Sequence, residues 1–308
     1  MVRAVGLQAD ERAAARTSGV ISKVTAVWEA GCLLGEGPVW LLREQQLRFV
    51  DIKAGRVFGF SPGTGDLLVV QTGGEPSFLV TAADGGQIAG SRNELLRFDA
   101  ETGFGVVLAH IPEPAGNRTN DATVDDRGRL WFGTMDDNQT APSGAVWCLD
   151  KGVLHRAGPT AVVTNGPAVS VDGTWLYHVD SGARTIWRFP LGDAPVLKNG
   201  TVFVQLTEAD GFPDGVVIDA EDCLWVALWD GWAVRRYAPD GTLLLHIPMP
   251  CARPTKVAFG GPDLTTAYVT SARVGLSEAQ LASQPLAGSL FAFAAPAPGR
   301  VLPEVLLS

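Results

Sequence analysis

Short apolar runs alternate with turn-forming residues along the chain. The runs are rich in β-branched and aromatic residues and end at Gly, Asp or Pro, a pattern typical of β-strands. The clearest runs lie at residues 47–51, 130–134, 175–180, 224–229 and 267–271. Further runs, most of them placed shortly after one of these, lie at 56–60, 94–98, 145–149, 185–189, 233–237 and 289–293. Turn sequences such as Pro239-Asp-Gly241 separate the runs, so the pattern predicts an all-β protein built from hairpins.

A third strand precedes each pair, and its first residue is polar. The leading residues are Glu36, Glu75, Asn120, Asn165, Asp214 and Thr255. Their spacings of 39, 45, 45, 49 and 41 residues match the length of a β-propeller blade. We therefore expect a six-bladed β-propeller over residues 21–308, preceded by a loose extension over residues 1–20. The strand at 23–28 has no unit of its own, and we expect it to complete the last blade and close the ring, which removes a free sheet edge.

Two other fold classes fit the pattern less well. A doubly wound α/β protein needs helical crossovers of about a dozen residues between parallel strands. The chain offers only a helical turn or two near residues 277–282. A two-sheet sandwich accommodates the strands but does not explain six similar units.

Composition narrows the class of partner. Hydrophobic residues make up 46% of the chain and charged residues 19%, with 36 glycines and 20 prolines, which excludes a disordered chain and argues against long helices. The net charge of −9 argues against a nucleic-acid surface. No apolar run is long enough to span a membrane, and no secretory apolar region follows the start. The four cysteines are far apart, so we expect neither a disulfide framework nor a zinc knuckle, and a reduced, cytoplasmic protein.

The polar leading residues suggest a metal site. The innermost strand of every propeller blade borders the central channel, so equivalent positions form a ring around the axis. Every leading residue carries a side-chain oxygen, and convergent oxygens suit a hard divalent cation such as Ca²⁺, Mg²⁺ or Mn²⁺. Such a cation would also offset the repulsion between carboxylates. The same residue types cap turns, although Glu, which occurs twice, is not a turn residue.

Arg118 adds a positive charge two residues before a ring position. Its planar guanidinium suits the oxygens of a substrate over the channel; the other interpretation is a surface arginine in a loop. A Gly-x-Ser-x-Gly match at 59–63 is interpreted as a hairpin turn, because a strand at 66–70 follows it and a nucleophile elbow needs a helix there. The four histidines offer no local metal-binding spacing.

At these residues the sequence resembles the regucalcin/gluconolactonase family of six-bladed propeller lactonases, over about residues 24–308. The resemblance rests on segments that occur in order and at blade spacing. They are 34–40 (LGEGPVW), 118–121 (RTND), 128–135 (GRLWFGTM), 164–167 (TNGP), 212–215 (FPDG) and 257–261 (VAFGG). Within the family the chain is most similar to bacterial sugar-acid lactonases of the xylonolactonase type, through Thr134-Met135 and segments 227–229 and 272–277.

The resemblance implies roles for individual residues. The family's metal ligands fall on Glu36, Asn165 and Asp214. Its substrate-contacting Arg and Asn fall on Arg118 and Asn120. One divalent ion is therefore implied, but its identity is not, because Ca²⁺, Zn²⁺, Mn²⁺, Mg²⁺ and Fe²⁺ are all reported in the family.

Two positions stay unassigned at this point. Some animal members have an acidic substrate contact shortly after the Gly-Thr-Met segment, where this chain has Asp136-Asp137-Asn138. The alignment of Glu75 with the other ring positions is the least secure of the six.

The resulting hypothesis is metal-assisted hydrolysis of an aldonolactone, a pentono- or hexonolactone, to the aldonic acid in carbohydrate catabolism. Asp214 is the expected base, because it is both a ring carboxylate and an implied ligand. The alternatives are a hydrolase of another ester or phosphotriester and a non-catalytic metal-binding propeller. Arg118 with Asn120 favours polyol recognition over an apolar ester. We expect a monomer or weak homo-oligomer whose partner is a small-molecule sugar lactone, with no nucleic-acid or membrane partner.

Overall fold

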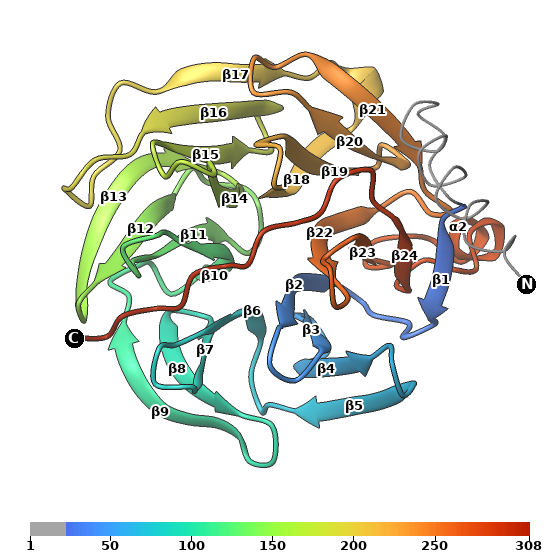
Figure 1. Cartoon of the computed structure of the whole chain (residues 1–308), viewed down its shortest axis with the longest axis horizontal. Coiled ribbons are helices and arrows are strands. Elements are labelled where there is room, and N and C mark those ends of the chain that lie inside the picture. Colours follow the sequence, from blue (N-terminus) through green and yellow to red (C-terminus); the bar gives the residue numbers. More distant parts are fainter. Residues whose placement is uncertain (1–22) are drawn as a thin grey trace, which may run out of the picture.

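The computed structural model describes residues 23–308 and confirms an all-β, six-bladed propeller (Figure 1). Blade 1 contains β2 (Gly35–Leu41), β3 (Gln46–Asp51), β4 (Arg56–Ser61) and β5 (Asp66–Gln71). Blade 2 contains β6 (Pro76–Thr81), β7 (Gln87–Ser91), β8 (Glu94–Asp99) and β9 (Gly103–His110). Blade 3 contains β10 (Asn117–Val124), β11 (Leu130–Asp136), β12 (Gly144–Asp150) and β13 (Val153–Ala161). Blades 4 and 5 contain β14 (Thr164–Val169), β15 (Trp175–Asp180), β16 (Thr185–Pro190) and β17 (Thr201–Gln205); and β18 (Phe212–Ile218), β19 (Leu224–Trp229), β20 (Ala233–Tyr237) and β21 (Leu243–Pro248). The extension expected at residues 1–20 lies outside the described residues.

Blade 6 is built from both ends of the described chain. Its strands are β22 (Pro254–Gly260), β23 (Thr266–Ser271), β24 (Leu290–Ala294) and β1 (Thr25–Trp28). The outermost strand, β1, pairs antiparallel with β24, and Thr25 lies opposite Ala292. This pairing joins the first described strand to the last blade and closes the ring. The ring therefore cannot open at this point without breaking the sheet of blade 6.

Helices are short. The helix α2 (Glu278–Ser283) begins at the N-cap Ser277, whose side chain accepts a hydrogen bond from the Gln280 N–H, and η1 (Glu208–Asp210) is a single 3₁₀ turn. Among residues 23–308, no helix is long and apolar enough to cross a membrane. All four cysteines are buried and free.

A buried aspartate recurs in the turn after the inner strand of blades 3 and 5. Asp125 accepts a hydrogen bond from the Trp131 indole N–H at 2.8 Å, and Asp219 accepts one from the Trp225 indole N–H, also at 2.8 Å. Both tryptophans are fully buried. Each aspartate also accepts backbone N–H groups of its own turn. The repeated side chains therefore hold both the turn and the packing between blades.

Every inner strand has an irregularity in its pairing at the same level of the channel. The register shifts lie between Glu36 and Val39, Pro76 and Phe78, Thr119 and Ala122, Asn165 and Ala168, Pro213 and Val216, and Pro254 and Val257. The polar positions were expected to lead the strands, but the structure places most of them inside, at these bulges. A bulge leaves extra residues unpaired and redirects their side chains. At Gly37, with φ +52°, an added Cβ would lie 3.0 Å from the Ser77 carbonyl oxygen, so this bulge needs glycine.

The C-terminal segment crosses one end of the central channel, as the red trace in Figure 1 shows. Residues 298–306 bind the turns that follow the inner strands: the Ala220 N–H donates to the Pro298 carbonyl at 2.9 Å, and the Leu306 N–H to the Gly128 carbonyl at 2.8 Å. A cavity of about 730 Å³ is lined by this segment and by Asp121 and Lys256 deeper in the channel. The residues described next approach the channel from the end where the inner strands begin.

Candidate active site in the central channel

Four of the predicted site residues come from four different blades and are all buried. Glu36 lies on β2, Asn120 on β10, Asn165 on β14 and Asp214 on β18. The Asn120 side-chain amide donates to Asn165 Oδ1 at 2.8 Å and to the Thr164 carbonyl at 2.8 Å, which ties blade 3 to blade 4. Because the inner strands of neighbouring blades are in contact around the ring, residues far apart in sequence meet here.

Asn165 is connected in turn to the strand that carries Asp214. Its side-chain N–H donates to Ser181 Oγ at 3.0 Å, and that hydroxyl donates to the Pro213 carbonyl at 2.7 Å. Asn165 Oδ1 accepts one hydrogen bond and keeps a second lone pair. The chain of bonds fixes the orientation of the amide.

The two predicted carboxylate ligands are close enough to influence each other. Burial raises the pKa of Glu36 to about 8, and the negative charge of Asp121 adds to this shift. Burial also raises the pKa of Asp214 well above its usual range, reinforced by the charges of Glu36 and Asp121. Both shifts favour the protonated carboxyl groups, whereas a cation bound beside them would favour the ionised forms.

Two charged residues of the channel were missed in the sequence. Asp121 on β10 and Lys256 on β22 are 1% and 7% exposed, and their side chains form an ion pair. Each follows a predicted ring position by one residue, within the same bulge. The signal that would have found them is that a bulge redirects two consecutive side chains, so the residue after each ring position can also face the channel.

Oxygen donors dominate this part of the channel, and they fit a hard divalent cation. Asp121 Oδ2 is buried and has no hydrogen-bond partner among residues 23–308, which is costly unless a cation or proton satisfies it. The carboxylates of Glu36 and Asp214 with the amide oxygen of Asn165 are the donor types that Ca²⁺, Mg²⁺ and Mn²⁺ prefer. No cluster of three or more His, Cys, Asp or Glu side chains occurs in ligand geometry within residues 23–308, so the candidate set depends on an amide ligand.

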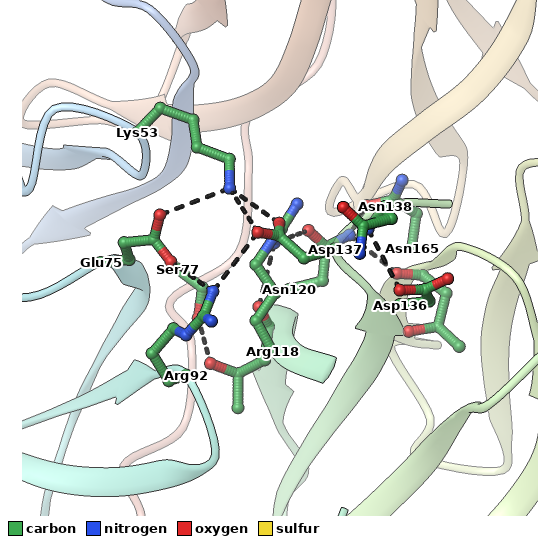
Figure 2. A network of polar contacts seen from close by, with 12 residues as sticks. Lys53, Glu75, Ser77, Arg92, Arg118, Asn120, Asp136, Asp137, Asn138 and Asn165 are labelled. Carbon is green, nitrogen blue, oxygen red and sulfur yellow. Dashed lines mark hydrogen bonds and ion pairs between the residues drawn. The ribbon is translucent and has the colours of Figure 1, made fainter. Parts of the chain in front are cut away.

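Arg118 is the centre of a polar network at the end of the channel where the inner strands begin (Figure 2). Arg118 as a whole is only 4% exposed. Nη1 donates to Asn120 Oδ1 at 2.7 Å and to the Thr119 carbonyl at 3.0 Å, and Nε donates to Asp137 Oδ1 at 2.7 Å. Arg118 is therefore not a mobile surface arginine, because bonds on two sides hold its plane.

Asp137 forms ion pairs with cationic side chains from three blades. Besides Arg118, it binds Lys53 Nζ at 2.7 and 2.8 Å and Arg92 Nη1 at 3.3 Å. Burial alone would raise the pKa of Asp137, but hydrogen bonds from Lys53 and Arg118 lower it below its ordinary value. Asp137 is thus an ionised anchor for Arg118. Its neighbour Asp136 instead caps its own loop by accepting the Thr140 and Ala141 N–H groups.

Two of the six leading residues do not face the metal-ligand candidates. Glu75 precedes β6 and pairs with Lys53 and Arg92 in the network of Figure 2. The buried residue of that bulge is Ser77, which hydrogen-bonds to Thr119 at 2.7 Å. Thr255 donates to the Gly35 carbonyl at 2.6 Å and so joins blade 6 to blade 1. At these two of the six expected ring positions, the side chains therefore form an ion pair and an inter-blade hydrogen bond.

Comparisons with known proteins find a matching family model and several similar proteins. Residues 34–273 match the family model of the SMP-30/Gluconolactonase/LRE-like region. The chain is 37% identical to a 6-deoxy-6-sulfogluconolactonase of Pseudomonas putida, over 87% of this chain and 93% of that protein. It is 32% identical to a pentonolactonase of Haloferax volcanii, over 81% and 85% of the two chains. A crystal structure of the calcium-binding protein regucalcin from Agrobacterium tumefaciens superposes with a TM-score of 0.87 at 29% identity, covering 92% of this chain and 97% of that one.

Proposed function

The chain belongs to the SMP-30/gluconolactonase/LRE-like family, and we propose that it hydrolyses a sugar lactone to the aldonic acid with the help of one divalent metal ion. The observation that carries the proposal is the convergence of Glu36, Asn165 and Asp214 from three blades on one buried region, with Arg118 fixed beside it through Asn120. The sulfogluconolactonase and pentonolactonase relatives support the substrate class. The regucalcin structure, described as a calcium-binding protein, supports the metal.

The metal would be held by Glu36, Asn165 and Asp214. When bound, a divalent ion supplies Lewis-acid polarisation of the lactone carbonyl and stabilises the negative charge that develops on its oxygen. The raised pKa values of Glu36 and Asp214 mean that proton and metal compete for these oxygens.

Asp214 is the proposed general base. Its carboxylate is buried in the candidate metal site, and a carboxylate oxygen that does not bind the metal can accept a proton. Asp214 takes a proton from the attacking water as the water oxygen bonds to the carbonyl carbon. The ester bond to the ring oxygen then breaks, and the proton on Asp214 becomes available to that oxygen, which leaves as a hydroxyl group.

Arg118 and Asn120 are the proposed substrate contacts. Arg118 Nη2 has no hydrogen bond within the described part of the chain, whereas Nε and Nη1 are held by Asp137 and Asn120. A fixed guanidinium with a free edge can bind sugar hydroxyls without losing freedom, which lowers the entropic part of the barrier. Asn120 orients Arg118 and retains one lone pair on Oδ1 for the substrate.

A pH-indicator assay tests this function, because the acid product releases a proton. The panel contains a pentonolactone, a hexonolactone, a 6-sulfonated hexonolactone, an aryl ester and a phosphotriester. We expect turnover of at least one lactone far above the uncatalysed rate and little turnover of the last two compounds. Exhaustive chelation should abolish turnover, and Ca²⁺, Mn²⁺, Mg²⁺, Zn²⁺ or Fe²⁺ added back should restore it. Full activity after chelator treatment that leaves no detectable bound metal would eliminate the metal-assisted mechanism.

The Asp137→Asn variant tests how Arg118 is positioned. Asparagine keeps the shape of Asp137 but removes the charge that attracts Arg118, Lys53 and Arg92, so the guanidinium gains freedom in the ground state. We expect KM for the preferred lactone to rise about tenfold, with a smaller change in kcat.

Asp84→Asn is the matched control for this variant. Asp84 lies in the turn between β6 and β7, and the substitution removes its ion pair with Arg97 on β8. Because Asp84 has no part in the network around Arg118, the variant should leave KM unchanged. An unchanged KM in Asp137→Asn, or an equal rise in the control, would contradict the positioning role.

A further inference from the structure

Asp121 and Lys256 meet across the channel axis. Asp121 comes from blade 3 and Lys256 from blade 6, which face each other across the ring in Figure 1. Lys256 Nζ contacts Asp121 Oδ1 and lies 3.4 Å from the Ala122 carbonyl oxygen. Space for the lysine is built into blade 5, because a Cβ on Gly215 would lie 2.6 Å from Lys256 Cβ. A buried ion pair at the channel axis can also influence the charge of the neighbouring carboxylates.

The charged side chains around the pair determine the net charge of the candidate metal site. Glu36, Asp121 and Asp214 are three carboxylates that act on one another electrostatically, and Lys256 acts on both Glu36 and Asp214 in the opposite sense. Arg118 also acts on Glu36, but its guanidinium is bound to Asp137. With Lys256 counted, the cluster has a formal net charge of −2, which balances the charge of +2 on one divalent ion.

The bonding of Asp121 shows where the lysine acts. Asp121 Oδ1 accepts hydrogen bonds from Lys256 and from the Ala122 N–H at 2.7 Å, whereas Oδ2 has no partner in the described part of the chain. The lysine therefore engages the carboxylate that is not an expected metal ligand and leaves Glu36 and Asp214 without an ion pair in the described residues. It lowers the negative charge of the site without occupying its ligands.

We propose that Lys256 sets the charge of the metal site: by neutralising Asp121 from the opposite blade, it matches the channel to a divalent ion. The role rests on the proposed metal-assisted function and deepens it. Lys256 and Asp121 are positioning residues in this proposal, since neither is required to touch the metal or the substrate. A purely structural ion pair would stabilise the fold without changing metal affinity in proportion to charge.

Four chelator-treated proteins separate these roles: the wild type, Lys256→Met, Asp121→Asn and the double variant. Their clusters carry net charges of about −2, −3, −1 and −2, by formal count. Calcium affinity is measured by calorimetric titration at one pH and ionic strength. We expect Lys256→Met to bind Ca²⁺ about tenfold more tightly or better, Asp121→Asn to bind about tenfold more weakly or worse, and the double variant to lie within about threefold of the wild type.

A trivalent lanthanide supplies a second readout that does not depend on activity. Such an ion prefers the same oxygen donors but carries one more charge, so Lys256→Met should gain more affinity for the lanthanide than for Ca²⁺. Circular dichroism confirms folding. If Lys256→Met does not fold, Asp121→Asn and the double variant still test the charge dependence.

The outcomes are distinguishable. Affinities that follow the formal charge support the role of Lys256. Calcium binding by the wild type with equal affinities in all folded variants, or a double variant as weak as Asp121→Asn, would overturn this role and leave the proposed function standing. A wild-type protein that binds none of the divalent ions would overturn the metal site and the role of Lys256 together.

Discussion

The Asp214→Asn variant is expected to lose at least about a thousandfold in kcat/KM for the preferred lactone while remaining folded. The substitution removes the proposed base and a proposed metal ligand but keeps the shape of the side chain. Asp214 is 5% exposed and lies beside the negative charges of Glu36 and Asp121, so its carboxylate is held for function at a cost to the fold.

That cost gives the variant a second, opposite effect. The pKa of Asp214 is raised in the folded protein, so the stability associated with this group is present below its unfolded pKa and is lost as pH rises toward the folded value. Asparagine cannot ionise, so the variant does not lose this stability as pH rises. At neutral pH and in the presence of chelator, Asp214→Asn should therefore unfold at the same temperature as the wild type or higher.

Thermal unfolding by circular dichroism and initial lactonase rates check both effects. Asp240→Asn is the control, because Asp240 lies in the exposed turn between β20 and β21 of the same blade and accepts hydrogen bonds from Thr242. It should change neither quantity. Near-normal turnover in Asp214→Asn would remove Asp214 from the mechanism, whatever its stability.

The largest loss of stability is expected from Asp219→Ala, about 3–5 kcal/mol of unfolding free energy. Asp219 is completely buried and accepts bonds from the Trp225 indole at 2.8 Å and from Arg236 Nε at 2.7 Å. Removing its carboxylate leaves a buried guanidinium and a buried indole N–H without their partner. Glu221 still binds Arg236 Nη2 at 2.6 Å, but from an exposed position that does not replace the lost charge.

Urea unfolding measures this effect, and the slope of the transition shows whether the change lies in the native state. Asp240→Ala again serves as the control, because this exposed turn residue should lose far less stability than Asp219→Ala. The folded fraction of Asp219→Ala should keep the kcat of the wild type, since the residue lies in the turn after β18 and not at the bulge of Asp214. A loss below about 1 kcal/mol would show that the aspartate is not the support of its blade.

Asp214 and Asp219 show that residue type alone does not predict the role of a buried aspartate. Both are buried aspartates near β18, yet one is surrounded by other carboxylates and the other by cationic and N–H donors. The repeat predicted a channel position for Asp214. It also placed Glu75 and Thr255 at equivalent positions, and these side chains form an ion pair and an inter-blade hydrogen bond instead.

The sequence by itself determined the fold class, the number of blades and the positions at which polar side chains approach the axis, because these follow from the repeat of apolar strands and turns. Only the tertiary structure decided which neighbouring side chain enters the channel and which partner it meets. At each bulge the strand loses its strict alternation, so one residue of shift exchanges Thr255 for Lys256. The ion pair of Asp121 with Lys256 depends on that shift and on which blades face each other. The ion pairs of Lys53 and Arg92 with Asp137 depend on the arrangement of three blades around the channel. Neither is set by local sequence pattern, since the partners are brought together by closure of the ring.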